Sequence, residues 1–408
     1  MGIEELTLAN TGDRDLTKLA EYRAVGGYKP LAKARKLKPE QVIEQLLASN
    51  LRGRGGAGFP MGRKASFLAK GTGKPTYLCV NADESEPGTF KDREIMLTNP
   101  HRLIEGCLVT AHAIESQGDV TIVLHRGAGA YICGEESALL ESLEGERGQP
   151  RPRPPFPAVS GLYGSPTLIN NVQTIATVPL IAEHGGEWYA KIGPEPSPGT
   201  VVFSLSGNVE RPGNYELELG TPLRELIYDI GGGIPGGREL KAVIPGGSST
   251  TVMTPDLLDT DLDFNSVAEA GSQLGAAAVI VIDDRACMVQ LALRSSQFYM
   301  HESCGKCTPC REGTRWLVQL LQKLEEGRAE QSELELLLSV CDRMIGKCLC
   351  ALGDFAAGPV VEYVRNFREE FQRHVDEGGC PFGGESSLEG VFAPVEQHTH
   401  HPVAEVPA

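Results

Sequence analysis

The chain has 408 residues, enough for about two or three domains, and 41% of them are hydrophobic, which is sufficient to fill their cores. Its 38 Lys and Arg residues against 54 Asp and Glu residues give a formal net charge of -16, which argues against binding to nucleic acid or to an anionic membrane. The longest strongly apolar run, residues 274–282, is too short to span a bilayer, and the first ten residues lack a signal-peptide core. We therefore expect a soluble cytoplasmic protein with no nucleic-acid partner and no direct membrane insertion.

A glycine-rich loop follows the first amphipathic segment. Residues 39–50 carry apolar residues at helical spacing and predict a helix. In the next stretch, RGRGGAGFP, Gly53, Gly55 and Gly58 spell GxGxxG, the dinucleotide-binding fingerprint. That fingerprint requires a strand before the loop, so the match fails as a Rossmann motif. The glycines still leave backbone N–H groups open to a phosphate or a flat ring, and a flexible surface turn is the alternative.

A βαβ unit is predicted next. Asn99 caps a helix over residues 99–116, and apolar runs at 76–81 and 120–125 flank it with the length of buried strands. The turns NADESEPG and RGAGAYICGEE follow these runs, at the strand ends where open parallel sheets bind ligands. The carboxylates of the first turn suit ribose or ribityl hydroxyls, and a solvated turn is the alternative.

The character of the sequence changes twice more. After a proline-rich stretch at 151–157, strand-like runs at 200–207 and 242–247 with a helix at 222–232 predict a small α+β module. From about residue 292 the apolar spacing is helical and predicts a bundle. The last thirty or so residues lack periodicity and are expected to be a disordered tail, in which His398, His400 and His401 are solvated rather than metal ligands. The predicted domains are 1–195, 196–291, 292–378 and the tail 379–408.

Two apolar helix faces define the expected bundle core. They comprise Trp316, Leu317, Leu320, Leu321 and Leu324, and then Val360, Val361, Val364, Phe367 and Phe371.

The cysteines point to a metal cluster. A cytosolic chain with eleven cysteines is not expected to form a disulfide framework. Those scattered through apolar surroundings are interpreted as small buried hydrophobes: Cys79, Cys107, Cys133 and Cys287. The run ESCGKCTPCREG spaces three cysteines as CxxCxxC, and Cys348 and Cys350 follow downstream. This spacing favours a [4Fe–4S] cluster, with zinc or free thiols as alternatives and either downstream cysteine as fourth ligand. Because a cluster moves single electrons, a flavin would be needed for a two-electron donor.

Seven motifs together resemble a known family. In order, and within about residues 18 to 380, they are RGRGGAGFP, NADESEPGTFKDR, HRGAGAYICGEE, PPFPA, INNV, IPGGSS and HESCGKCTPCREG. They are similar to the NADH-binding flavoprotein subunit of respiratory complex I. The resemblance implies a Rossmann-like α/β domain for FMN and NADH, a β-grasp-like α+β module and a helical bundle that carries the cluster.

The same resemblance implies function and partners. NADH would pass a hydride to FMN without a catalytic side chain, and electrons would then move singly to a [4Fe–4S] cluster and onward, with quinone as the final acceptor of the whole complex. The partners would be a thioredoxin-like [2Fe–2S] subunit and a multi-cluster iron–sulfur subunit, at the cytoplasmic face of the inner membrane. The diaphorase subunit of a soluble hydrogenase or formate dehydrogenase, and a non-catalytic cluster scaffold, are the alternatives.

The resemblance also implies roles for residues at matching positions. FMN would contact Gly53, Arg54, Gly55, Lys64, Asn81, Asp83, Glu84, Tyr131, Gly134, Glu135, Asn170 and Asn171. NADH would stack over the flavin and meet Phe59, Phe67, Phe156, Glu86 and Glu136. The cluster would be held by Cys304, Cys307, Cys310 and Cys350, which leaves Cys348 as a bystander.

Two departures from the family pattern stand out. Arg153 occupies a position where the family usually has Lys, which keeps the charge. More seriously, residues 117–119 alone join the predicted helix to the predicted strand at 120–125, where family members carry roughly forty more residues, about the size of one more βαβ crossover. We therefore expect a smaller and less stable sheet with an unaltered set of site motifs.

Overall fold

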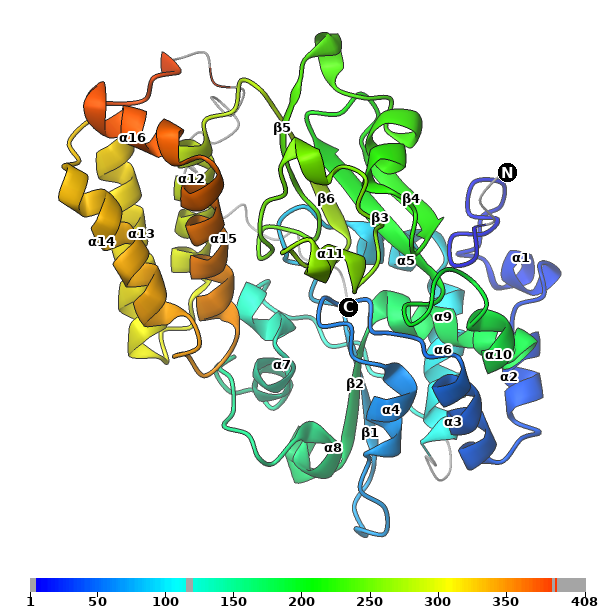
Figure 1. Ribbon diagram of the computed structural model, residues 1–408. Coiled ribbons are helices and arrows are strands. Elements are labelled where there is room, and N and C mark those ends of the chain that lie inside the picture. The colour runs from blue at the N-terminus through cyan, green and yellow to red at the C-terminus, as the bar shows by residue number, and fades with distance from the viewer. Residues whose placement is uncertain (1–4, 115–119, 384–385, 387–408) are drawn as a thin grey trace, which may run out of the picture.

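The protein is described by a computed structural model that covers residues 5–114, 120–383 and 386. Figure 1 shows three regions: helices around a short pair of strands, a larger sheet above them, and a helical bundle to one side. None of the helices in the described ranges combines the length and apolar character needed to cross a membrane. The mixed α/β architecture with a C-terminal helical region confirms the predicted fold class. The domain boundaries stay predictions.

The N-terminal region is mainly helical. Its helices are α1 (Leu19–Ala24), α2 (Lys29–Ala34), α3 (Pro39–Ala48), α4 (Met61–Ser66), α5 (Lys91–Thr98), α6 (Pro100–Ala113), α7 (Glu136–Leu143), α8 (Pro157–Ser160), α9 (Val172–His184) and α10 (Gly186–Tyr189), with a short 3-10 turn η1 (Tyr131–Gly134). Strands β1 (Tyr77–Asn81) and β2 (Thr167–Asn171) pair in parallel, so that Asn81 lies opposite Asn171. Gly106 lets α6 approach α9, because a Cβ there would lie 2.1 Å from the carbonyl oxygen of Ile175.

The predicted strand at 120–125 is wrong. Residues 120–130 form no regular element, and the partner of β1 is β2. Val123 and Leu124 are 79% and 97% exposed, so this apolar run lies on the surface. An apolar run becomes a strand only where a neighbouring edge can accept its backbone hydrogen bonds. In the described residues the sheet of this region has two strands, β1 and β2.

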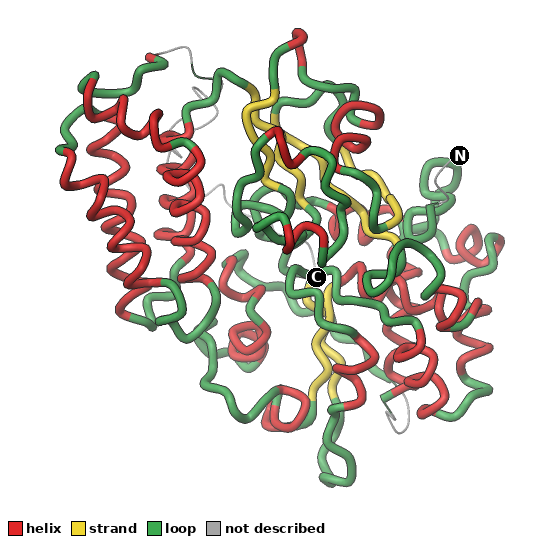
Figure 2. The backbone as a smooth tube through the Cα atoms, viewed as in Figure 1, coloured by secondary structure: helices red, strands yellow, loops and turns green. Residues whose placement is uncertain are grey.

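The second region is a four-stranded mixed sheet. Its strands are β3 (Thr200–Gly207), β4 (Gly213–Glu218), β5 (Leu240–Ile244) and β6 (Ala278–Asp283), in the order β4-β3-β6-β5. The pair β3 and β6 is parallel, and the two outer pairs are antiparallel. A π-helical turn (Glu225–Ile230) and α11 (Ser266–Glu269) accompany the sheet, which Figure 2 shows as the larger group of strands.

The third region is the predicted bundle. It contains α12 (Met288–Glu302), α13 (Thr308–Glu325), α14 (Gln331–Met344), α15 (Leu352–Asn366) and α16 (Arg368–Asp376). Leu317, Leu321 and Val360 are fully buried as expected, whereas Trp316 is 52% exposed, which corrects its assignment to the core. The bundle core is continuous with Ile132 of η1, so the bundle packs directly against the N-terminal region. The tail histidines 398, 400 and 401 lie outside the described residues.

Candidate functional site

The glycine loop closes on itself after α3. Arg52 and Pro60 form an isolated antiparallel bridge, and the Gly53 N–H donates to the Phe59 carbonyl at 3.0 Å. At Gly55 a Cβ would lie 2.8 Å from the Cβ of Asn171, so only glycine lets the loop backbone approach the end of β2 this closely. The loop follows a helix, as its sequence predicts, and it lies beside the polar ends of both strands.

Arg54 is the clearest candidate for an anion-binding residue in the loop. Its side chain is buried, and its Nη2 donates to the Tyr189 hydroxyl at 3.2 Å and to the Pro198 carbonyl at 3.0 Å. Its backbone N–H donates to Thr174 Oγ1 at 2.9 Å. Among the residues that the structure describes, its Nε and Nη1 atoms have no hydrogen-bond partner. A buried guanidinium with two free donors suits a phosphate group, so this position fits the phosphate of a flavin nucleotide.

Two asparagines mark the strand ends. Asn81 Nδ2 donates to the Gly134 carbonyl at 2.9 Å, which ties β1 to η1. Asn171 Oδ1 accepts from the backbone of Gln173 at 2.9 Å and caps α9. Asn170 is buried, and within the described part of the chain its Nδ2 has no partner. The structure therefore brings all three predicted asparagines together and leaves one buried donor for a ligand.

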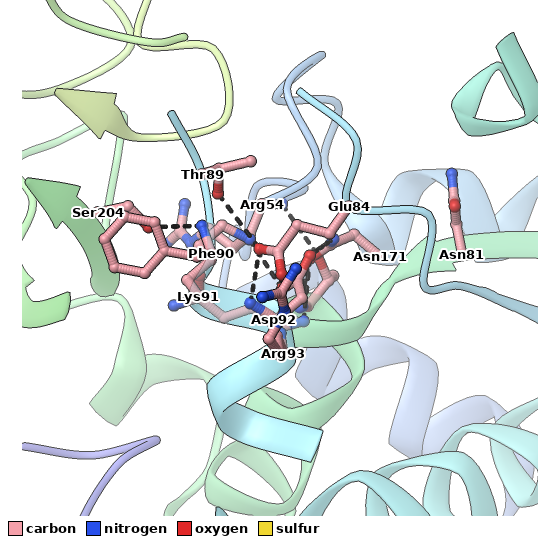
Figure 3. A network of polar contacts seen from close by, with 12 residues as sticks. Arg54, Asn81, Glu84, Thr89, Phe90, Lys91, Asp92, Arg93, Asn171 and Ser204 are labelled. Atoms are coloured by element: carbon pink, nitrogen blue, oxygen red, sulfur yellow. Dashed lines mark hydrogen bonds and ion pairs between the residues drawn. The ribbon is translucent and has the colours of Figure 1, made fainter. Parts of the chain in front are cut away.

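A polar network supports these strand ends (Figure 3). Lys91 Nζ and Asp92 Oδ1 form a buried ion pair at 2.8 Å, and Asn171 Nδ2 donates to Asp92 Oδ2 at 2.5 Å. Glu84 accepts from the backbone N–H groups of Asp92 and Arg93, each at 2.8 Å. Glu84 thus caps the start of α5, and burial together with the nearby Asp92 charge raises its pKa. Its predicted contact with a flavin hydroxyl would have to share these acceptor oxygens.

Asp83 and Glu86 are carboxyls in a low-dielectric setting. Glu86 accepts from the Tyr131 hydroxyl and from the Ser249 N–H, each at 2.7 Å. Burial raises the pKa of Glu86 above its usual range in spite of these hydrogen bonds, and burial likewise raises the pKa of Asp83. The Tyr131 N–H in turn donates to Glu302 of α12 at 3.0 Å. Tyr131 and Glu86 therefore connect η1 to both the sheet region and the bundle.

The predicted cationic and acidic residues near α7 neutralise one another. Lys64 Nζ lies 2.7 Å from Glu136 Oε2, and Arg153 lies 3.2 Å from Glu136 Oε1. Arg153 also contacts Glu135, whose carboxylate accepts from the Ser137 and Ala138 N–H groups and caps α7. The Lys64 ammonium is therefore paired with Glu136, and its predicted contact with FMN stays a prediction.

The three predicted aromatic side chains are accessible to a ligand. Phe59, Phe67 and Phe156 are 45%, 54% and 56% exposed. The rings of Phe59 and Phe67 lie 6.3 Å apart between centroids at an interplanar angle of 45°. Exposed aromatic rings of this kind offer stacking surfaces for a flat ligand ring.

All five predicted cysteines line one small pocket at the start of α13. The pocket wall contains Cys304, Cys307, Cys310, Cys348 and Cys350, together with Ile132, Pro150, Ser303, Lys306, Leu349 and Leu352. The Leu349 N–H donates to Cys307 Sγ at 3.2 Å, and Ser303 Oγ lies 3.2 Å from Cys310 Sγ. Burial raises the pKa of the Cys350 thiol to about 11. Such a concentration of soft donors, with hydrogen bonds aimed at sulfur, fits an iron–sulfur cluster.

Several supporting residues were not singled out from the sequence. Lys91 and Asp92 belong to the quoted motif NADESEPGTFKDR, which was the available signal. Thr174 lies two residues after the motif INNV, and Ser249 is the last residue of the motif IPGGSS. The centroid of the Phe264 ring lies 4.2 Å from Arg52 Cζ, and no motif in the sequence marks Phe264 as part of the site.

Comparison with known proteins identifies the family. The description "NADH-ubiquinone oxidoreductase-F iron-sulfur binding region" matches residues 290–374, and "Nuo51 FMN-binding domain" matches residues 46–120 and 110–180. An "SLBB domain" matches residues 202–252. The NADH-quinone oxidoreductase subunit designated F 2 in Rhizobium meliloti (strain 1021) is 49% identical over 418 residues, with 93% of this chain and 99% of that protein covered. The chain belongs to the F-subunit family of NADH-quinone oxidoreductases.

Another member of this family and one solved structure agree. The F subunit of the NADH-quinone oxidoreductase of Streptomyces coelicolor (strain ATCC BAA-471 / A3(2) / M145) is 48% identical over 399 residues, with 88% of this chain and 89% of that protein covered. The crystal structure of NAD+-reducing [NiFe]-hydrogenase in the H2-reduced state superposes with a TM-score of 0.81 at 31% identity. That match covers 91% of this chain and 67% of the other. These findings confirm the recognised family and the predicted fold class.

The family comparison also locates the missing segment. The FMN-binding description matches in two pieces that overlap at residues 110–120. Because 93% of the 408-residue chain is about 380 residues, the 418-residue alignment contains roughly 39 positions without a counterpart here. Both observations agree with a lost crossover between α6 and the exposed run at 120–125. The residues of the candidate flavin and cysteine sites all lie outside that gap.

Proposed function

We propose that this chain is the electron-input subunit of an NADH-quinone oxidoreductase. It oxidises NADH at FMN and passes electrons to a [4Fe–4S] cluster, in agreement with the FMN-binding and iron–sulfur regions that the family comparison identifies. One observation carries the proposal. The turn η1 contributes Tyr131 and Gly134 to the candidate flavin site, and its Ile132 lines the cysteine pocket. A single four-residue turn therefore separates the two candidate redox sites.

The proposed roles of the flavin-site residues follow from their contacts. FMN, when bound, supplies the ability to accept a hydride and release single electrons, so no side chain has to act as acid or base. The free N–H groups of Arg54 bind the phosphate, and the glycine backbone at Gly53 and Gly55 lets the ligand come close. Further residues proposed to surround FMN are Lys64, Asn81, Asp83, Glu84, Tyr131, Gly134, Glu135, Asn170 and Asn171.

The proposed NADH and cluster residues form two further sets. Phe59, Phe67 and Phe156 offer stacking surfaces for the adenine, and Glu86 and Glu136 accept hydrogen bonds from the nicotinamide and ribose groups. Cys304, Cys307, Cys310 and Cys350 hold the cluster. Cys348 is proposed as the bystander because its thiol is directed to the Met344 carbonyl, 3.7 Å away, and so donates to backbone.

Removal of the Arg54 guanidinium tests the flavin site. We expect Arg54→Ala to lose FMN on purification, because the phosphate would lose a buried charged partner. Arg63→Ala is the matched control, since Arg63 is an exposed arginine on the nearby helix α4. FMN content per chain and dye-linked NADH oxidation are measured on both variants, with circular dichroism as the check on folding. Full FMN retention in a folded Arg54→Ala chain would contradict the assignment.

The chain is a subunit of a multi-subunit enzyme, as its family membership requires. We propose that its neighbours are a thioredoxin-like [2Fe–2S] subunit and a multi-cluster iron–sulfur subunit, held at the cytoplasmic face of the membrane. The 31% identity to an NAD+-reducing [NiFe]-hydrogenase chain keeps a soluble hydrogenase complex as the second candidate. Affinity purification from the native host separates the two, because quinone reductase subunits or a hydrogenase would be recovered. Iron without dye-linked NADH oxidation would favour the non-catalytic scaffold.

A further inference from the structure

A second group of metal-ligand side chains lies at the far end of the bundle. Cys287 precedes α12, Glu325 ends α13, His374 lies on α16 and Cys380 follows that helix. One ligand atom from each of these residues lies within 4.8 Å of all the others. The CxxCxxC cysteines flank the opposite end of α13, whose 18 residues span about 27 Å. Figure 1 shows α16 lying across this end of the bundle.

The distances between these atoms match a tetrahedral zinc site. Cys287 Sγ lies 3.7 Å from Cys380 Sγ, 3.3 Å from His374 Nε2 and 3.9 Å from Glu325 Oε2. His374 Nε2 lies 3.5 Å from Glu325 Oε2. Zinc bonds of about 2.3 Å to sulfur and about 2.0–2.1 Å to nitrogen or oxygen, at tetrahedral angles, place sulfur atoms about 3.8 Å apart and the other pairs about 3.4–3.6 Å apart. A metal would therefore fit with movements of a few tenths of an ångström.

The surroundings orient the ligands as metal sites require. His374 Nδ1 lies 2.7 Å from the Glu370 carbonyl, and because a carbonyl only accepts, Nδ1 carries the proton and Nε2 presents a lone pair. Gln290 Nε2 donates to Glu325 Oε1 at 2.7 Å, which leaves Oε2 facing the sulfur atoms. The Gln290 N–H is directed to Cys287 Sγ at 3.4 Å. The first two contacts fix a ligand without occupying its coordinating atom, and the third is a backbone N–H directed at sulfur, as thiolate ligands of metal sites accept.

We propose that Cys287, Glu325, His374 and Cys380 bind one zinc ion as a closed structural site, separate from the iron–sulfur cluster. All four tetrahedral positions would be filled by protein, which distinguishes a structural site from a catalytic one. Two thiolates and a carboxylate offset the charge of Zn²⁺ in a place where the imidazole of His374 is fully buried. The ion would link α12, α13 and α16 to the segment after α16, and so fix the C-terminal end of the bundle.

A disulfide is the competing explanation for two neighbouring cysteines. The sulfur atoms of Cys287 and Cys380 are 3.7 Å apart, well beyond a covalent bond of about 2.05 Å. A disulfide would use the two sulfur atoms alone, and His374 and Glu325 would then pair only with each other, Nε2 to Oε2 at 3.5 Å. The two explanations differ in what mass spectrometry and metal analysis would find.

Metal content of the full-length protein tests the proposal. Protein purified with its iron and flavin, and then equilibrated with Zn²⁺ and desalted, should hold about one zinc per chain. Cys380→Ala should hold almost none while its iron content is unchanged. Cys341→Ala is the matched control, because Cys341 is a buried cysteine of the same bundle on α14 and should leave zinc unchanged. Absence of zinc from the wild-type protein, full zinc in Cys380→Ala, or a Cys287–Cys380 disulfide would each overturn the proposal.

Zinc-edge X-ray absorption on the wild-type protein gives a result that does not depend on any variant folding. The expected shell is two sulfur atoms at about 2.3 Å and two nitrogen or oxygen atoms at about 2.0–2.1 Å. A shell of four sulfur atoms would place the zinc in the other cysteine pocket and would overturn the assignment.

Discussion

Asp92→Asn should be among the most damaging conservative substitutions near the flavin site. The Lys91 and Asp92 side chains are 1% and 4% exposed and form an ion pair at 2.8 Å. The substitution keeps the shape and leaves the Lys91 ammonium buried without its partner. Breaking a buried pair by removing one charge costs about 3–5 kcal/mol. Because the Glu84 carboxylate is close enough for the Lys91 charge to lower its pKa, it compensates in part, so we expect about 3 kcal/mol.

Thermal unfolding of matched variants measures this cost. At about 2–4 °C per kcal/mol, the midpoint of the N-terminal region should fall by roughly 6–12 °C. Asp259→Asn is the control, since Asp259 pairs with Arg224 on the open surface and should leave the midpoint unchanged. The double variant Lys91→Met with Asp92→Asn removes both charges and should be more stable than Asp92→Asn alone. A loss below about 1 kcal/mol in Asp92→Asn, or a double variant less stable than the single one, would refute the reasoning.

Three further predictions test the candidate sites. Cys350→Ser should abolish the cluster while Cys348→Ser retains about four irons per chain, and iron analysis with the opposite result would exchange their roles. Burial raises the pKa of Glu86 in the folded chain, so the carboxyl ionises first in the unfolded chain as the pH rises past 4.5. The thermal unfolding midpoint of the wild-type protein should therefore fall with rising pH, relative to that of Glu86→Gln, until the pH passes the folded-state pKa. A pH-independent difference would contradict that. Glu136→Gln should raise the ratio of kcat/KM for NADPH to kcat/KM for NADH by on the order of tenfold, which corresponds to relief of about 1.4 kcal/mol of repulsion between the carboxylate and the 2′-phosphate. Lys64 and Arg153 would then be free to attract the phosphate. An unchanged ratio would show that Glu136 does not face the 2′-phosphate.

Local elements were predictable because their patterns are complete within a few turns of chain. Helices α3 and α6 and strand β1 lie where periodicity and the Asn99 cap place them. The run at 120–125 is as apolar as β1, but no neighbouring strand edge accepts its backbone hydrogen bonds. The sequence shows that a run is apolar, but it does not show whether such an edge is present. The prediction for Trp316 was wrong for a related reason, since helical spacing finds an apolar face but not where its margin meets solvent.

The candidate site shows the same division between residue identity and residue role. Glu84 and Glu135 were expected as ligand contacts, and the structure uses both to cap helices, Glu84 across a separation of eight or nine residues. The sequence predicts that Arg54 contacts a phosphate, but it does not predict that the side chain is buried. The burial depends on Tyr189 and Pro198, which lie 135 and 144 residues further along the chain. Cys287 is fully buried, as the sequence predicts, but its neighbours His374 and Cys380 lie 87 and 93 residues further along the chain, where no local pattern shows them.

The short connection after α6 affects the surface of the protein more than its candidate site. A sheet of two strands is weak by itself, so the position of β1 and β2 must come from their neighbours. The Asn81 contact with Gly134, the packing of Gly55 on Asn171 and the hydrogen bond from Asn171 to Asp92 all join strand ends to segments outside the gap. Exposed Val123 and Leu124 instead form part of an apolar surface segment, the kind of surface at which chains associate. The loss should therefore appear first as self-association of the isolated chain, before any loss of flavin.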